Sequence, residues 1–341
     1  MPPTFQTNDD RETTAASVLI GSIDIDAGRI LAAHDHTGRI ARELASRGCL
    51  VSEWWRVQGP NRPACAWPSD GPFDAATVRL SKDKTAFEMA LHAVISQVRI
   101  GGKLWVYGAN DEGIKSASKR IATLCPDVRT IQTQRHCRVL EATIESIPPT
   151  LKPSLSDWEQ TVTLDFPTGA IEQRSYPGVF AKGKLDSGSA LLLGAIPKPQ
   201  PSTAVLDYAC GSGVIAMGLL SIEPLLDITL LDADAVAMEA AKHNVPRAKA
   251  VLGDSLANLR AEDTFDLIVA NPPYHAGKGR SDAVVQALIA QAPRHLTDGG
   301  ALWMVLQKQV DVRHSLNQIF SGVSHTDQGA YRVWHARSPH P

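Results

Sequence analysis

The chain has 341 residues, of which 43% are apolar and 21% charged, and its formal net charge is -2. This is the composition of a globular protein, and the length predicts two domains. No apolar stretch approaches the roughly 20 residues that a membrane-spanning helix requires, so membrane insertion is not expected. The small net charge excludes a protein that coats nucleic acid by charge alone, although a local basic patch is compatible with it.

The five cysteines form no C-x-x-C pair. We therefore predict neither a zinc site nor a disulfide framework, and we expect no bound metal. Because the N-terminal segment is polar and acidic rather than basic and then apolar, no secretory signal is expected. The predicted location is the reducing cytoplasm, and the predicted state is a monomer.

In chain order, residues 1–15 are predicted to form a disordered tail, and 16–145 a first domain. The segment 146–157 is predicted to be a linker, because it concentrates prolines, which do not fit the interior of a helix or sheet. Next, TVTLDF and IEQRSYP flank PTGA and predict a hairpin. The run DSGSALLLGAI then predicts a helix capped by Asp186 or Ser187.

A regular alternation of strands and helices follows. Apolar runs of strand length, such as TAVLDYA, DITLLDA, KAVLGD, FDLIVAN and ALWMVLQ, alternate with helical segments such as AVAMEAAKHN and DAVVQALIAQAPRHL. This alternation is typical of an α/β fold with a doubly wound, mostly parallel sheet. We therefore predict a Rossmann-like second domain over 158–341.

The first half of the chain repeats part of this pattern. Residues 73–108 align with 265–306, which matches a Phe-Asp pair to a Phe-Asp pair and Gly101-Gly102 to Gly299-Gly300. The second copy is six residues longer between these anchors, and the surplus lies in NPPYHAGKGR, where the first copy has LSKD. We predict a duplicated fold in which the first copy lacks a glycine-rich turn and binds no cofactor.

Glycines follow the strand VLDYA at a predicted strand-to-helix turn. Gly211 and Gly213 let the backbone approach a ligand closely, although their spacing also satisfies the weak dinucleotide fingerprint. Asp207 decides between the two ligands, because a carboxylate here repels a pyrophosphate and attracts a cationic sulfonium. The turn therefore predicts S-adenosyl-L-methionine as the cofactor.

Acidic residues also end the next two strands. Asp232 stands 19 residues after Gly213, where its carboxylate can accept both ribose hydroxyl protons, and Asp254, followed by Ser255, is expected at the adenine. Each aspartate alone fits a helix cap or turn equally well, so the prediction depends on their order along successive strands. Cys210 is expected as a small residue of the cofactor site, not as a nucleophile, because no His/Asp partner is evident.

The strand FDLIVA ends in Asn271, Pro272, Pro273 and Tyr274. An exocyclic base amine or a carboxamide is a poor nucleophile, since its lone pair is conjugated. The Asn271 Oδ1 atom and the Pro272 carbonyl can each accept one amine hydrogen and turn the lone pair toward the sulfonium methyl. The prolines stiffen this pair, and the Tyr274 ring offers a flat face for stacking. We predict that these four residues are catalytic and that Asn271 also borders the cofactor.

Several motifs together resemble those of ribosomal RNA guanine-N2 methyltransferases that act on small-subunit RNA, and of similar enzymes for the large subunit. They are PGVFAKGKLDSGSALLL, VLDYACGSG, LLDAD, GDSL, NPPYH and GGALW, within about 176–306. The resemblance implies two fused class I methyltransferase-like domains, of which only the second is catalytic and the first serves RNA recognition. It implies that Asp207, Gly211 and Gly213 contact the methionine part of the cofactor. It also implies that Asp232 contacts the ribose and that Asp254 contacts the adenine.

Two stretches are expected to contact RNA. The loop after the catalytic motif supplies Tyr274, His275, Lys278 and Arg280. The segment 99–138 has a local excess of Lys and Arg that can follow phosphates, with a solvated helix face as the alternative. Its cations expected to contact RNA are Lys115, Lys119 and Arg120. Trp54 and Trp55 are expected in a core or an interdomain contact rather than as a stacking platform.

The same N-P-P-Y chemistry serves other planar amines. Adenine N6 in RNA or DNA and the N5 amide of a protein glutamine are therefore the alternative substrates, and a non-catalytic RNA-binding factor is the alternative from another class. The fused first domain favours RNA. We predict an enzyme that methylates guanine N2, with ribosomal RNA or a ribosomal subunit assembly intermediate as its partner.

Overall fold

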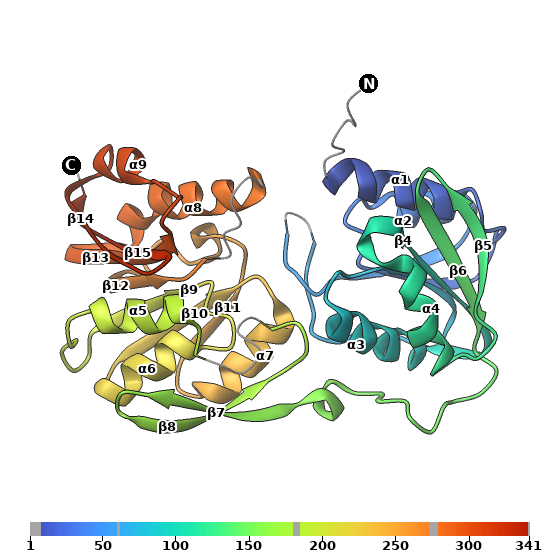
Figure 1. Ribbon diagram of the computed structural model, residues 1–341, viewed down its shortest axis with the longest axis horizontal. Helices are drawn as coiled ribbons and strands as arrows, with labels where there is room; N and C mark the ends of the chain where they lie inside the picture. Colours follow the sequence, from blue (N-terminus) through green and yellow to red (C-terminus); the bar gives the residue numbers. More distant parts are fainter. Residues whose placement is uncertain (1–7, 60–61, 180–184, 273–278, 340–341) are drawn as a thin grey trace. The chain divides into compact units, whose positions relative to one another are not determined.

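The computed structural model describes residues 8–59, 62–179, 185–272 and 279–339 (Figure 1). The chain divides into two compact units. Unit 1 comprises Met1–Arg56 and Cys65–Glu159, and unit 2 comprises Val57–Ala64 and Gln160–Pro341. Each unit has one large mixed sheet with helices packed on it, so the predicted α/β class with two Rossmann-like sheets is confirmed.

Unit 1 is built on a six-stranded sheet of order β2-β1-β3-β4-β6-β5. Strands β1 to β4 are parallel, and β6 and β5 run antiparallel to their neighbours. Its elements in chain order are α1 (Asn8–Ile20), β1 (Arg29–Ala33), α2 (Arg39–Ser46), β2 (Leu50–Trp54), β3 (Phe73–Arg79), α3 (Lys84–Ile95), β4 (Val98–Ala109), the 3-10 helix η1 (Asn110–Glu112), α4 (Ile114–Ala122), β5 (Arg129–Gln134), β6 (Cys137–Thr143) and η2 (Leu155–Trp158).

Helix α1 begins at Asn8, so the predicted disordered tail over 1–15 is wrong from residue 8 onward. Residues 1–7 lie outside the described residues. The helix is ordered because Ala15, Ala16 and Leu19 are buried in the apolar cluster on one face of the sheet. These apolar side chains find packing partners only when the sheet has formed. The polar sequence around them does not indicate those partners.

The proline-rich linker packs against unit 1. The Lys152 amide donates to Nδ1 of His92 at 3.0 Å, and Nε1 of Trp67 donates to the Pro153 carbonyl at 3.0 Å. Trp158, at the end of η2, is buried edge-on against the His92 ring. The segment 146–157 therefore contacts unit 1 at Lys152 and Pro153 before the chain enters unit 2 at Gln160.

Unit 2 is built on a seven-stranded sheet of order β11-β10-β9-β12-β13-β15-β14, in which only β15 and β14 are antiparallel to their neighbours. Its elements in chain order are β7 (Gln160–Phe166), β8 (Gly169–Ser175), α5 (Ser187–Ala195), β9 (Ala204–Tyr208), α6 (Val214–Ile222), β10 (Asp227–Asp232), α7 (Ala235–Asn244), β11 (Lys249–Leu252), η4 (Leu256–Asn258), β12 (Phe265–Ala270), α8 (Gly279–Gln291), η5 (Ala292–His295), β13 (Leu296–Gln307), α9 (Arg313–Asn317), β14 (Phe320–Gln328) and β15 (Tyr331–Pro339).

Strand β12 lies between β9 and β13 near the middle of this sheet. Its side chains enter the apolar clusters on both faces, which is why residues 267–270 form an uninterrupted apolar run. Strands β7 and β8 form the predicted hairpin. Helix α5 has the predicted cap, since the Asp186 carboxylate accepts from the Ser189 amide at 3.1 Å.

The predicted repeat is visible in the registers of both sheets. Strands β3 and β4 pair with a bulge between Phe73 and Ala75, and β12 and β13 pair with a bulge between Phe265 and Leu267. Asp74 Oδ2 accepts from the amide of the first residue of β1 at 2.7 Å, and Asp266 Oδ2 accepts from the amide of the first residue of β9 at 3.0 Å. The two sheets therefore share an irregularity and a side-chain contact, as a duplicated fold would.

Candidate active site

The carboxyl ends of β10, β9 and β12 lie side by side in the unit 2 sheet. Tyr208 is in register with Leu231 on one side and with Ala270 on the other. The next residues of the outer strands, Asp232 and Asn271, therefore flank the turn that follows β9. Ligands of parallel α/β sheets bind at this edge, and here the fold brings together Asp232, the glycine turn and Asn271.

The turn after β9 depends on its two glycines. Gly211 and Gly213 have φ angles of 55° and 82°, a region that favours glycine. A Cβ at Gly213 would lie 3.2 Å from Cγ2 of Val245, so this glycine lets the turn approach α7. A Cβ at Gly211 would meet nothing within 4 Å, so there the backbone borders open space that a ligand can enter.

The hairpin and α7 hold this turn in place. Nδ2 of Asn244 donates to the Ser212 carbonyl at 2.9 Å and to the Arg174 carbonyl at 2.9 Å, and its Oδ1 accepts from the Arg174 amide at 2.8 Å. Nε2 of Gln173 donates to the buried Ser212 hydroxyl. The sequence predicted the hairpin as an element but not this bracing role, which residues 32 to 70 positions apart in the chain perform together.

Asp207 lies beneath the turn, with none of its surface exposed. Its Oδ2 accepts from the Ala216 amide in α6 at 3.0 Å, and its Oδ1 has no hydrogen-bond partner among the described residues. Burial, with a smaller contribution from Asp232, raises the pKa of this carboxyl to about 7. The sequence predicted Asp207 beside the sulfonium, whereas in the structure its buried carboxyl lies beneath the turn and binds the first turn of α6.

Asp232 contacts the turn directly. Its Oδ2 accepts from the Gly211 amide at 2.7 Å, and its Oδ1 accepts from the Asp234 amide at 2.8 Å. Burial raises the pKa of Asp232 to about 6. Cys210 is buried beside it, and burial with the two nearby carboxylates raises the pKa of its thiol well above the ordinary value. A thiol in this setting is unsuited to act as a nucleophile.

The next strand end carries Asp254, which is exposed, and Ser255. Oδ1 of Asn258 accepts from both of their amides, at 3.1 Å and 3.2 Å, so this asparagine fixes the backbone that presents them. A Cβ at Gly253 would lie 2.5 Å from Cβ of Asn258, so the contact requires glycine there. Asp254 was predicted from the sequence but Asn258 was not, although its position in the turn G-D-S-L-A-N could have indicated it.

One segment from the first half of the chain belongs to unit 2 and lies beside β10. The Gln58 amide donates to the Ala233 carbonyl at 2.7 Å, and Val57 forms a bridge with Asp234. Both partners directly follow the predicted ribose acid. The expected domain boundaries did not include this contribution of residues 57–64 to unit 2.

Asn271 ends β12 with its side chain held by two residues of the α5 region. Its Nδ2 donates to Oδ2 of Asp186 at 3.0 Å and to the Ser189 hydroxyl at 2.9 Å. Pro272 is buried. Pro273, Tyr274, His275 and Lys278 lie outside the described residues. Arg280 is in α8, where the structure describes its backbone only.

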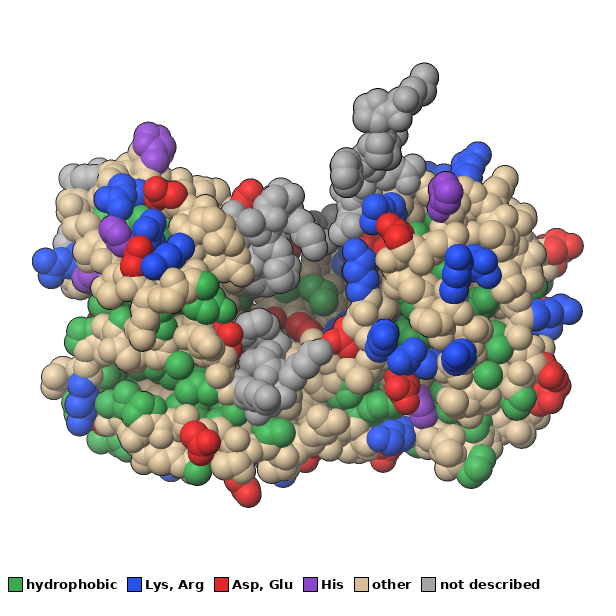
Figure 2. Space-filling view, in the orientation of Figure 1, with side chains coloured by type: hydrophobic (Ala, Val, Ile, Leu, Met, Phe, Trp, Pro, Cys, Tyr) green, Lys and Arg blue, Asp and Glu red, His purple; other side chains and the backbone are tan. Residues whose placement is uncertain are grey.

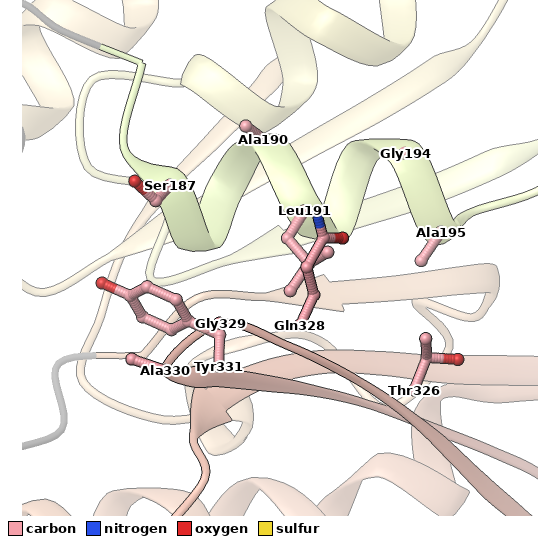
Figure 3. Close-up of a pocket in the computed structure, with 10 residues that line it drawn as sticks. All are labelled: Ser187, Ala190, Leu191, Gly194, Ala195, Thr326, Gln328, Gly329, Ala330 and Tyr331. Carbon is pink, nitrogen blue, oxygen red and sulfur yellow. The ribbon is translucent and has the colours of Figure 1, made fainter.

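A groove runs beside this site between α5 and the β14–β15 hairpin (Figure 3). Its volume is about 680 Å³, and Tyr331 lies at its Ser187 end. A Cβ at Gly188 would lie 3.3 Å from Cε1 of Tyr331 and 3.5 Å from Nδ2 of Asn271, so this glycine lies close both to a lining residue of the groove and to the predicted catalytic side chain. Tyr331, the first residue of β15, was not among the residues predicted for the site.

The predicted RNA-contacting cations of unit 1 lie on α4. Lys115 and Lys119 are exposed and Arg120 is partly buried, and none of the three forms an ion pair with another described residue. Lys and Arg side chains gather over this part of unit 1 in Figure 2. This surface can attract a polyanion without first breaking a salt bridge.

Within the described ranges, no helix is long and apolar enough to cross a bilayer. In the same part of the chain, no group of three or more His, Cys, Asp or Glu side chains is arranged to hold a metal ion. The candidate site therefore consists of the glycine turn after β9, the acidic residues at the strand ends and Asn271.

Comparisons with known proteins show the family to which the chain belongs. The Methyltransferase small domain model matches residues 170–335, and the model of its N-terminal domain matches 58–161. A ribosomal RNA small subunit methyltransferase C from Shewanella halifaxensis is 30% identical over 272 residues, which are 78% of each chain. The protein of the same name from Ectopseudomonas mendocina is 34% identical over 240 residues, which are 69% of this chain and 70% of its own.

The fold also matches a solved structure, the T. thermophilus 16S rRNA N2 G1207 methyltransferase in complex with AdoMet and guanosine. The TM-score is 0.84 at 22% identity, and the match covers 95% of this chain and 91% of the other. The predicted two-domain fold and the predicted family are both confirmed. The chain is a methyltransferase that belongs to the ribosomal RNA small subunit methyltransferase C family.

Proposed function

We propose that this protein transfers the methyl group of S-adenosylmethionine to the N2 amine of a guanine in small-subunit ribosomal RNA. The observation that carries the proposal is the position of Asn271 beside the glycine turn, with its amide nitrogen bound to Asp186 and Ser189. The side chain thereby offers a carbonyl oxygen where an amine must lie to reach the cofactor. The names of the relatives supply the class of RNA.

The residues at the turn fit the cofactor. The open space above Gly211 admits its methionine part, and the Oδ1 atom of Asp207, beneath the turn, is an acceptor without a partner among the described residues. We propose that Asp232 binds the ribose hydroxyls and Asp254 the adenine. When bound, S-adenosylmethionine supplies an electrophilic methyl group on a positively charged sulfur.

The chain's own contribution is to make the amine nucleophilic. Asn271 Oδ1 and the Pro272 carbonyl each accept one hydrogen of the N2 amine, which draws the lone pair out of conjugation with the ring. These acceptors also stabilise the positive charge that develops on the nitrogen. The ring of Tyr274 stacks on the guanine and holds its plane.

Unit 1 is proposed to recognise RNA through the cations of α4, and unit 2 to carry the chemistry. The substrate is ribosomal RNA or a subunit assembly intermediate, met by a monomer in the cytoplasm. Adenine N6 and protein glutamine N5 remain the alternatives in the same chemical class. Mass analysis of nucleosides from RNA treated with the purified protein separates them, since only the proposed reaction produces N2-methylguanosine.

The decisive variant is Asn271→Ala. We expect its single-turnover methylation rate to fall roughly 100- to 1000-fold, because a preorganised contact to the transition state is lost. Its cofactor affinity, measured by calorimetry, should stay close to that of the wild type. Asn317→Ala, at an exposed asparagine of α9, is the matched control and should react at the wild-type rate.

Tyr274→Ala should behave differently from Asn271→Ala. Because stacking precedes methyl transfer, this variant should bind RNA more weakly as well as react more slowly. If Asn271→Ala methylates guanine N2 at the wild-type rate, the proposed acceptor mechanism is wrong.

A further inference from the structure

Two side chains at the start of helix α5 hold Asn271, and the mechanism above gives neither of them a part in the reaction. Oδ2 of Asp186 lies 3.0 Å from Nδ2 of Asn271, and the Ser189 hydroxyl lies 2.9 Å from the same nitrogen. We infer that Asp186 and Ser189 are positioning residues, which orient and polarise the Asn271 amide for methyl transfer. This inference rests on the proposed role of Asn271 as an amine acceptor.

The contact to Asp186 decides which way the Asn271 amide faces. A carboxylate accepts hydrogen bonds and cannot donate them, so the NH2 group must face Asp186. Both of its hydrogens then have acceptors, and Oδ1 is directed away from α5. No described residue donates a hydrogen bond to this oxygen, which leaves it available for a substrate amine.

The charge of Asp186 also strengthens the acceptor. Hydrogen bonds donated by an amide nitrogen to a charged group polarise the amide and place more negative charge on its oxygen. As the attacking amine becomes positive, a negative charge fixed one amide away lowers the energy of that state. Asp186 therefore acts on the reaction through Asn271, without itself contacting the substrate.

Capping of α5 does not by itself explain this arrangement. The cap requires only that Asp186 accepts from the Ser189 amide, at 3.1 Å. It does not require the buried Ser189 hydroxyl to bind a residue 82 positions away. A Cβ at Gly188 would lie 3.0 Å from Oδ2 of Asp186 and 3.5 Å from Nδ2 of Asn271, so a glycine between the two side chains lets the strand end approach.

A double-mutant cycle tests the inference, with the single-turnover methylation rate of the full chain as readout. Asp186→Ala should lower the rate roughly 10- to 100-fold, because a hydrogen bond to a charged group is lost, and Ser189→Ala roughly 2- to 10-fold. In the Asn271→Ala background, both substitutions should have little further effect on the rate. A residue that acts through Asn271 loses its influence when Asn271 is absent, whereas a structural residue does not.

Two further variants separate charge and folding from positioning. Asp186→Asn keeps an acceptor for the Ser189 amide and for Asn271 but removes the charge, so it should react faster than Asp186→Ala and slower than the wild type. Asp83→Ala removes a comparable cap, since Asp83 accepts from the Thr85 and Ala86 amides at the start of α3. It should lower the melting temperature without changing the methylation rate.

The outcomes distinguish this inference from the proposed function. The positioning role is refuted, and the acceptor role stands, if Asn271→Ala is slow as expected but Asp186→Ala and Ser189→Ala react at the wild-type rate. The same holds if the two substitutions slow the Asn271→Ala variant further by their full factors. If Asn271→Ala itself is fully active, the acceptor role fails first. Both conclusions about the positioning role require that the Asp186 and Ser189 variants bind the cofactor with close to wild-type affinity.

Discussion

The two units share a fold but differ at the edge where a cofactor is expected. Ala33 is in register with Trp54 in unit 1, as Tyr208 is with Leu231 in unit 2. The turns that follow have the same length. Each begins with a non-glycine residue of positive φ, His34 at 60° and Ala209 at 55°, and ends with a glycine of positive φ that caps the next helix. The backbone of the turn is therefore preserved in both copies.

The side chains on this backbone are not preserved. By the same register, Ala32 stands where unit 2 has Asp207, His36 where it has Gly211, and Trp55 where it has Asp232. Trp55 is buried, with 4% of its surface exposed, and lies edge-on to the His36 ring at 6.4 Å. Trp54 is also buried, as expected for a core residue.

A further residue closes the unit 1 turn. The buried Asp35 carboxylate accepts from the Thr37 and Ile40 amides and from the Thr37 hydroxyl. The amides at the start of α2 are thus bound by the chain itself, whereas unit 2 leaves open space over Gly211. The turn backbone is therefore a property of the fold, whereas ligand chemistry depends on three or four side chains placed on it.

The largest expected effect comes from moving a unit 1 residue into unit 2. Gly211→His should weaken S-adenosylmethionine binding roughly 100-fold or more, because a β-carbon strains a φ of 55° and the ring fills the open space. Calorimetry measures the affinity of this variant for S-adenosylmethionine. The reciprocal variant, His36→Gly, should leave the affinity unchanged. Tight binding by Gly211→His, or weak binding by His36→Gly, would place the cofactor elsewhere.

The next effect concerns stability. It comes from Asp207, a buried acid at a position where unit 1 has Ala32. The pKa of Asp207 is raised to about 7 in the folded chain, so folding favours the protonated carboxyl. Its contribution to stability is therefore present below about pH 4 and is lost as the pH rises through about 7. Relative to Asp207→Asn, the wild type should lose roughly 4 kcal/mol of unfolding free energy between pH 4 and pH 8. Parallel pH profiles in urea unfolding would contradict this.

A smaller effect is expected at Asp232, where unit 1 has Trp55. Burial raises the pKa of Asp232 to about 6, and ribose hydroxyls bind the ionised carboxylate. Lowering the pH from 7.5 to 5.5 should therefore weaken cofactor binding roughly four-fold, the inverse of the ionised fraction. Asp232→Asn should bind more weakly and without this pH dependence. A pH-independent wild type would remove Asp232 from the cofactor contacts.

The smallest expected effect tests whether the α4 cations of unit 1 contact RNA. Lys115→Gln, Lys119→Gln and Arg120→Gln should each flatten the log-log salt dependence of RNA binding by roughly 0.7 if each contacts a phosphate of a single strand. Lys198→Gln, at an exposed lysine of unit 2, is the matched control and should leave the slope unchanged. Unchanged slopes in all four variants would make the α4 surface an ordinary solvated helix face.

The sequence alone determined most of the unit 2 fold and the candidates for its site. Strands, helices and the glycine turn follow from local patterns of apolar residues, glycines and caps, which act over a few residues. The ordered acids after successive strands predicted Asp232 and Asn271 at one edge, because parallel strands end together. The repeat was also readable, since Phe-Asp and Gly-Gly mark a bulge that both sheets need.

Only the tertiary structure decided which side chains act together. Asp186 and Ser189 meet Asn271 across 85 and 82 residues, and Asn244 braces the turn from another helix. The helical state of residues 8–15 and the unit 2 location of residues 57–64 likewise depend on distant partners. Such contacts leave no periodic signal in the sequence, because their energy comes from groups that become neighbours only after the sheet has formed.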